Sequence, residues 1–102
     1  MSKLKTATLI TYDLPSAKMS QAEVTAFHRR LYGYTDYSNH GKYQYERKGL
    51  LSEIPHLNPS RSVVILPKHK TGDVLTFLYE YGAKVFSIDV VLNDRQSKAL
   101  SK

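Results

Sequence analysis

A strand-and-helix pattern occurs twice in this chain, and this repetition is the strongest constraint on its fold. The segment Leu14-Pro15-Ser16-Ala17-Lys18 returns as Leu66-Pro67-Lys68-His69-Lys70. Each copy follows a β-branched apolar run and precedes an amphipathic helix pattern that ends at a Tyr-Gly pair. The repetition predicts two similar halves, at about residues 4–48 and 60–92.

Hydrophobic periodicity predicts the order strand, helix, strand, strand, helix, strand. A capping box formed by Ser20 and Glu23 begins the first helix, and Gly33 ends it. Thr71 is predicted to cap the second helix. The predicted strands are residues 6–15, 43–48, 61–66 and 84–92, and the predicted helices are residues 20–32 and 71–81.

The last strand has a strict alternation of side chains. Phe86 and Ile88 share one face with Val90 and Leu92, whereas Ser87 and Asp89 lie on the other. The alternation predicts that Ser87 and Asp89 mark the face in contact with water.

Two strand-helix-strand units with right-handed crossovers pack as a four-stranded antiparallel sheet with both helices on one face. We therefore predict an α+β fold, a ferredoxin-like βαββαβ domain over residues 1–94, with a polar tail at 95–102 that is either frayed or a short helical appendage. The outer strands would be residues 43–48 and 85–92. Because an unpaired outer strand can accept another strand, we expect a homodimer, or a peptide bound at an outer strand or in the groove between the repeats.

Composition restricts the class of protein. A chain of 102 residues forms one modest core, and a formal charge of +6 attracts polyanions at moderate salt. The chain has no cysteine, and no apolar run reaches the length of a signal peptide or a membrane span. We expect a cytoplasmic protein with no membrane association.

The segment 29–48 combines aromatic and basic side chains. It holds five of the eight tyrosines. Aromatic rings stack on bases and basic groups contact phosphates, so this composition suits single-stranded nucleic acid. It also suits a protein interface, and some rings could simply complete the core. The candidate binding residues are Arg29, Arg30, Tyr34, Tyr37, Lys42, Tyr43, Tyr45, Arg47 and Lys48.

Signals for catalysis are few. The four histidines lack metal-ligand spacing, and the chain has neither a Gly-x-Ser-x-Gly elbow nor a phosphate-binding glycine pattern. We expect a non-catalytic protein without a metal or other cofactor.

The first predicted strand ends in Tyr12-Asp13-Leu14-Pro15. This ending resembles that of the small ferredoxin-fold CRISPR-associated proteins, which act as dimers. The resemblance implies that Asp13 is a Mg²⁺ ligand paired with its counterpart across a dimer, as in a Mg²⁺-dependent nuclease. The alternative role for Asp13 is a turn residue that ends the strand. The whole chain, which is short, cysteine-free and rich in tyrosine, also resembles small orphan proteins of archaeal viruses.

Overall fold

The computed structural model describes residues 5–101, which form an α+β structure with two antiparallel sheets. The chain divides into two compact units. One comprises the residues up to Pro15 together with those from Ile54 onward, and the other comprises Ser16–Glu53. Each unit is described by itself below.

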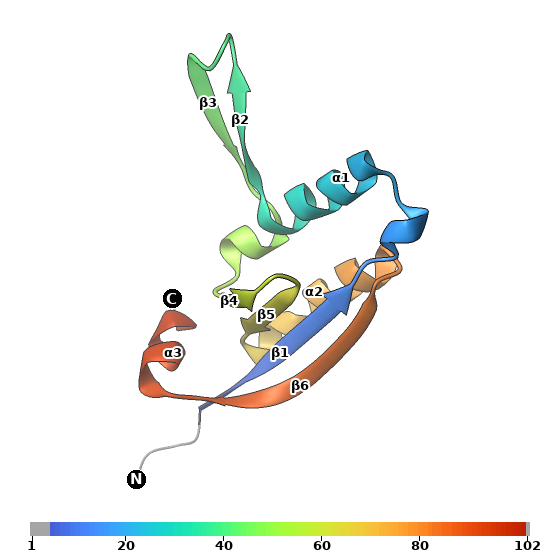
Figure 1. The fold of residues 1–102 in the computed structure, drawn as a ribbon. Helices are drawn as coiled ribbons and strands as arrows, with labels where there is room; N and C mark the ends of the chain where they lie inside the picture. Colours follow the sequence, from blue (N-terminus) through green and yellow to red (C-terminus); the bar gives the residue numbers. More distant parts are fainter. Residues whose placement is uncertain (1–4, 102) are drawn as a thin grey trace. The chain divides into compact units, whose positions relative to one another are not determined.

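A four-stranded antiparallel sheet forms the centre of the first unit. Its strands are β1 (Lys5–Asp13), β4 (Leu57–Ser60), β5 (Val63–Leu66) and β6 (Lys84–Leu92), in the order β4-β5-β1-β6 (Figure 1). The pairing of β1 with β6 is continuous, from Lys5 opposite Leu92 to Asp13 opposite Lys84. Three of the four predicted strands therefore lie in this sheet.

The prediction for residues 43–48 as an outer strand of this sheet is wrong. The place beside β5 is taken by β4, which contains Pro59. Proline lacks a backbone N–H, but an outer strand has one edge that needs no hydrogen bonds and can accommodate it. Residues 43–47 do form a strand, but it pairs with residues 34–38 in a separate two-stranded sheet.

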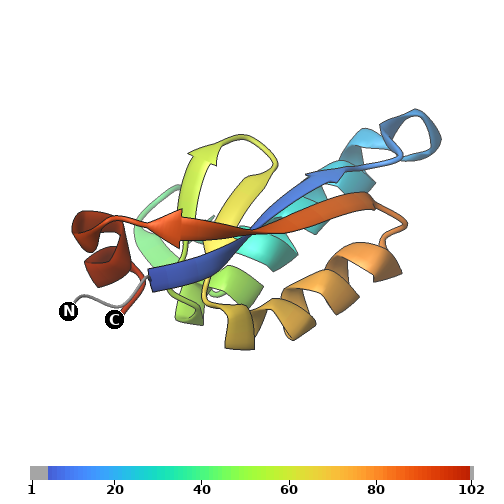
Figure 2. The same cartoon turned by 90° about the horizontal axis from the view of Figure 1, so that it is seen from below.

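Helix α2 (Thr71–Glu80) lies on one face of the sheet (Figure 2). It buries Val74 and Leu78, and the sheet buries Ile10, Val64 and Leu66. A single 3-10 turn, η3 (Lys68–Lys70), leads into this helix. Thr71 does not cap it, contrary to the prediction: Lys70 is the N-cap residue, and the Thr71 hydroxyl donates to the Lys68 carbonyl at 2.8 Å.

The C-terminal residues, predicted to be a frayed tail or a short helical appendage, form the short helix α3 (Asp94–Ala99). A capping box begins it, because Asn93 Oδ1 accepts from the Gln96 N–H at 2.8 Å and the Asn93 N–H donates to Gln96 Oε1 at 3.0 Å. Ser97 and Leu100 are buried, so this segment is part of the packed unit.

The side of β6 that faces away from α2 carries apolar side chains, Phe86, Ile88, Val90 and Leu92. Lys68, which leads into α2, forms an ion pair with Asp89 at 2.8 Å, so the Asp89 side of β6 faces the helix. Phe86 and Ile88 therefore lie on the open face, where they are 61% and 45% exposed. We predicted that the Ser87 and Asp89 side of β6 is the side in contact with water. In the structure the other side, with Phe86 and Ile88, is exposed as well.

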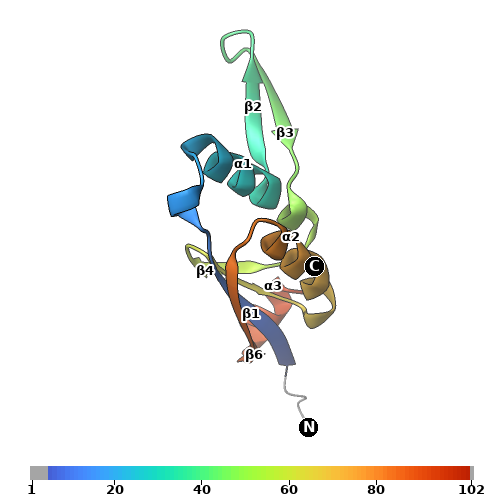
Figure 3. The ribbon, with the colours of Figure 1, turned by 90° about the vertical axis from the view of Figure 1, so that its right-hand side faces the viewer.

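The second unit contains helix α1 (Gln21–Tyr32) and a β-hairpin of β2 (Tyr34–Ser38) and β3 (Tyr43–Arg47). Two 3-10 turns, η1 (Ser16–Lys18) and η2 (Leu50–Glu53), flank them. The predicted capping box of α1 is confirmed: Ser20 Oγ accepts from the Glu23 N–H at 3.1 Å, and the Ser20 N–H donates to Glu23 Oε1 at 3.0 Å. The helix stops at Gly33, whose φ is +83°. Within this unit the hairpin extends beyond the end of α1 (Figure 3).

The repeated Leu-Pro segments adopt the same local structure. Pro15 is followed by η1 and then α1, and Pro67 is followed by η3 and then α2. Both helices also end near a glycine of positive φ, Gly33 at +83° and Gly82 at +73°. No helix among residues 5–101 has the length and apolar character that crossing a membrane requires.

Candidate binding site on the hairpin

The register of the hairpin places three tyrosines on one face. Tyr34 is opposite Arg47, Asp36 is opposite Tyr45, and Ser38 is opposite Tyr43. Directly opposed residues of an antiparallel pair point to the same side, and side chains alternate along each strand. Tyr34, Tyr43 and Tyr45 therefore share one side, which we call the tyrosine face.

Each ring of the tyrosine face has a basic group beside it. The Arg29 guanidinium carbon lies 4.5 Å from the centroid of the Tyr34 ring. Arg47 lies 5.6 Å from the Tyr45 centroid, and the Lys42 ammonium lies 5.8 Å from the Tyr43 centroid. These distances fall within the range of cation–π attraction. The pairs place a positive charge next to each exposed ring.

An acidic residue of the same face orients one of these cations. Asp36 Oδ2 accepts from Arg47 Nη2 at 3.3 Å and from Nε at 3.4 Å. Both side chains are about half exposed, so this ion pair contributes under about 1 kcal/mol to stability. Its effect is to hold the guanidinium between Tyr45 and Asp36. Asp36 is not among the residues predicted from the sequence, because its position opposite Tyr45 depends on the register of the hairpin.

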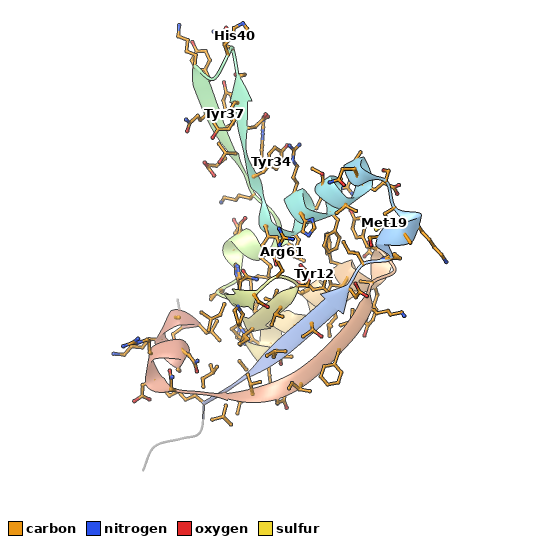
Figure 4. All side chains as sticks on the ribbon, viewed as in Figure 1. Tyr12, Met19, Tyr34, Tyr37, His40 and Arg61 are labelled. Atoms are coloured by element: carbon orange, nitrogen blue, oxygen red, sulfur yellow. The ribbon has the colours of Figure 1, made fainter. Side chains whose placement is uncertain are left out.

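The opposite face of the hairpin is different. It carries Tyr37, 59% exposed and opposite Gln44, and the pair Thr35 and Glu46, whose hydroxyl and carboxylate form a hydrogen bond of 3.1 Å. Figure 4 shows Tyr34 and Tyr37 along the hairpin and His40 at its tip. The two faces therefore differ in charge as well as in the number of rings.

The nine residues predicted from the sequence do not all meet. Six belong to the tyrosine face or lie against it: Arg29, Tyr34, Lys42, Tyr43, Tyr45 and Arg47. Tyr37 is on the other face, and Arg30 follows Arg29 on α1, about 100° further around the helix. Lys48 is paired with Glu53 of η2 at 2.9 Å, and this hydrogen bond and positive charge lower the pKa of Glu53.

The tip of the hairpin has an unusual backbone. Asn39, His40 and Gly41 have φ values of +54°, +57° and +84°. Asparagine and glycine tolerate this region, and successive positive φ values suit the twist of a tight hairpin. The turn is closed by the Lys42 N–H, which donates to the Asn39 carbonyl at 3.1 Å. The turn therefore places Lys42 directly before β3, beside Tyr43.

Asp13 is the last residue of β1, where it is exposed and lies opposite Lys84 in the pairing with β6. Among residues 5–101, no group of three or more His, Cys, Asp or Glu side chains is placed to hold a metal ion. Strand β1 ends at Asp13, directly before Leu14-Pro15.

No family model, no curated protein and no solved structure matches this chain.

Proposed function

We propose that this protein is a non-catalytic binding module that takes single-stranded nucleic acid on the tyrosine face of the hairpin. The observation that carries the proposal is the set of three cation–π pairs on one side of the hairpin, Arg29 with Tyr34, Arg47 with Tyr45 and Lys42 with Tyr43. Single-stranded nucleic acid needs aromatic platforms for its bases and positive charge for its phosphates, repeated along one direction.

The spacing along the hairpin suits this role. Tyr43 and Tyr45 are two residues apart on β3, which separates them by about 6.8 Å along the strand. Both rings are about half exposed, so each can offer a free ring area to an incoming base. Five basic residues against two acidic ones in the segment 29–48 supply the attraction for the backbone.

The strand order of the four-stranded sheet supports a finer description of the fold. We infer that the chain is ferredoxin-like: the order β4-β5-β1-β6 is the one that two interleaved strand-helix-strand units produce, with β4 in the place predicted for residues 43–48. The hairpin is then an insertion between the first helix and the second strand of that fold. An experimental structure with α1 on the sheet face opposite α2 would contradict this inference.

Fluorescence anisotropy with labelled single-stranded DNA and RNA oligonucleotides tests the function. The variant Tyr43→Ala/Tyr45→Ala removes two rings, and we expect a loss of about 1–3 kcal/mol for each base that stacked on them, which is at least a fivefold weaker affinity. The matched control is Tyr37→Ala, which removes an exposed ring of the same hairpin from its other face. Its affinity should stay within about twofold of the unmodified protein.

A salt titration distinguishes nucleic acid from a protein partner. For binding through phosphates, the logarithm of the binding constant falls linearly with the logarithm of the salt concentration, and Arg47→Ala should reduce that slope by about one. Equal affinity in the Tyr43→Ala/Tyr45→Ala variant and the unmodified protein would remove the proposal. Absence of oligonucleotide binding at low salt, with a protein complex on the tyrosine face that survives high salt, would assign that face to a protein partner instead.

A further inference from the structure

Strand β6 is an outer strand with little of the usual protection against pairing, since its only charged residues are Lys84 at its first position and Asp89. It has nine residues, none of them proline, and its register with β1 shows no bulge over its whole length. Among residues 5–101 the sheet adds no strand beyond it, and β6 lies nearest the viewer in Figure 2. Outer strands of this length are normally interrupted by proline, bulges or free charges, because their open N–H and C=O groups pair with other chains.

The side chains of β6 also favour pairing with another strand. Phe86, Ile88 and Val91 are among the most exposed large apolar residues of the chain, at 61%, 45% and 62%. The one acidic residue of the strand, Asp89, is held by Lys68 at 2.8 Å. Its charge is therefore partly compensated within the chain and opposes strand pairing less than a free carboxylate would.

We propose that β6 is a homodimerisation strand, which pairs antiparallel with β6 of a second copy about a two-fold axis at Ile88. A two-fold axis normal to the sheet leaves corresponding faces of the two copies on the same side. Opposed residues in an antiparallel pair point to the same side, so the axis must lie where a residue is opposite its own counterpart in the second copy. Ile88 is the midpoint of Lys84–Leu92, and only this centre pairs all nine residues.

The side-chain pairs favour this register over its neighbours. With Ile88 at the axis, Phe86 is opposite Val90 of the second copy, Val91 is opposite Val85, and Asp89 is opposite Ser87. A shift of the axis to Asp89 would set two carboxylates against each other. A shift to Ser87 would set Asp89 against Val85. Cross-strand apolar pairs stabilise antiparallel sheets and like charges destabilise them, so the Ile88 register is the favourable one.

The open face of the sheet is continuous across the proposed axis. Leu57 is opposite Ile65, Ile65 is opposite Leu9, and Leu9 is opposite Ile88. One aliphatic side chain from each strand thus forms a row that ends at the open edge of β6. In the dimer this row meets its counterpart, and Ile88 gains an aliphatic neighbour on the side that is now exposed.

Single-cysteine cross-linking tests the register, and the chain contains no cysteine of its own. In the Ile88→Cys variant the two Cβ atoms would be about 4.5–5.5 Å apart, so mild oxidation should yield a disulfide-linked dimer. In Phe86→Cys the two cysteines would be about 14 Å apart along the strands and should not cross-link. A mixture of Phe86→Cys and Val90→Cys should cross-link, because these positions are opposed. Cross-linking that is equal at all positions would overturn the proposal.

Light scattering and sedimentation of the cysteine-free protein give an independent measurement. We expect twice the chain mass of 11.6 kDa, and Ile88→Lys should weaken the dimer at least tenfold. Tyr79→Lys, at an exposed apolar position on α2, is the matched control and should leave the mass unchanged. A monomer at every concentration up to about 1 mM would overturn the proposal, provided that circular dichroism shows the protein folded. Because Ile88 and the tyrosine face belong to different compact units, failure here leaves the nucleic-acid proposal untouched.

Discussion

The backbones of Gly33 and Gly49 are in contact at the base of the hairpin, closer than a residue with a Cβ atom would allow. A Cβ atom on Gly49 would stand 2.3 Å from the Gly33 nitrogen, and a Cβ on Gly33 would stand 2.5 Å from the Arg47 carbonyl oxygen. The Gly49 N–H also donates to Ser52 Oγ at 2.9 Å. This close approach joins the end of α1 to the end of β3, and so anchors the hairpin to its unit.

The first prediction concerns this contact. Gly49→Ala should lower the free energy of unfolding by about 1–3 kcal/mol, because the neighbouring atoms are backbone and cannot move aside without strain. Gly72→Ala is the matched control, since a Cβ there meets nothing within 4 Å and the residue lies in α2. It should be neutral or stabilising by up to about 1 kcal/mol. Urea unfolding measures both, and equal stabilities of the two variants would contradict the steric argument.

The capping box of α1 gives the second prediction. Ser20→Ala removes the acceptor for the Glu23 N–H and should cost about 1 kcal/mol of stability. Thr25→Ala, at an exposed position within the same helix, should be neutral or slightly stabilising because alanine has the higher helix propensity. Thermal unfolding followed by circular dichroism compares them. A Ser20→Ala protein as stable as the Thr25→Ala protein would show that the cap contributes nothing.

The third prediction concerns acid. Hydrogen bonds from the Ser20 backbone N–H and hydroxyl lower the pKa of Glu23 below its ordinary value of 4.5, and the hydrogen bond and charge of Lys48 do the same for Glu53. The unfolded chain therefore binds these protons more readily than the folded one. The contribution of these two carboxylates to the free energy of unfolding is present above pH 4.5 and is lost as the pH falls through the lowered pKa values.

Denaturant unfolding between pH 6 and pH 2.5 tests this. The variant Glu23→Gln/Glu53→Gln cannot ionise at these positions, and glutamine keeps the capping hydrogen bond at position 23. Its stability should therefore fall less steeply with acid than that of the unmodified protein. Identical acid profiles for the two proteins would rule out a contribution from these carboxylates.

The fourth prediction concerns the turn between β4 and β5. Ser62 has a φ of +60°, a region that costs a residue with a Cβ about 1–2 kcal/mol, and its carbonyl accepts from the Tyr12 N–H at 3.1 Å. Ser62→Gly should relieve this strain and stabilise the protein by up to about 1 kcal/mol after the entropy of glycine in the unfolded chain is counted. Ser60→Gly, in the strand, should destabilise it. The midpoints of urea unfolding give both signs, and a loss of stability in Ser62→Gly would refute the assignment.

The fifth prediction rests on the proposed nucleic-acid binding. Asp36→Asn removes the carboxylate that holds Arg47 and one negative charge from the tyrosine face. The affinity for single-stranded oligonucleotides should rise several-fold, and the salt dependence should steepen by about one charge. Stability should change by less than about 1 kcal/mol, because the ion pair is exposed. Weaker binding by Asp36→Asn would mean that the ordered position of Arg47 matters more than its freedom to reach a phosphate.

The sequence by itself determined the features that depend on neighbouring residues. The capping box of Ser20 and Glu23, the helix end at Gly33 and the strand over residues 84–92 were all predicted, because each depends on side chains within a few positions of one another. The concentration of tyrosine and basic residues in 29–48 was also visible.

Only the tertiary structure decided which strands pair and which faces are covered. Residues 43–47 alternate in the manner of any strand, but their partner is β2 and not β5, and that choice depends on contacts far apart in the chain. Alternation likewise assigns Phe86 and Ile88 to a common side, yet it cannot indicate that α2 packs on the other side. The same limit applies to the tyrosine face: the register of the hairpin, and not the composition, separates Tyr37 from Tyr43 and Tyr45.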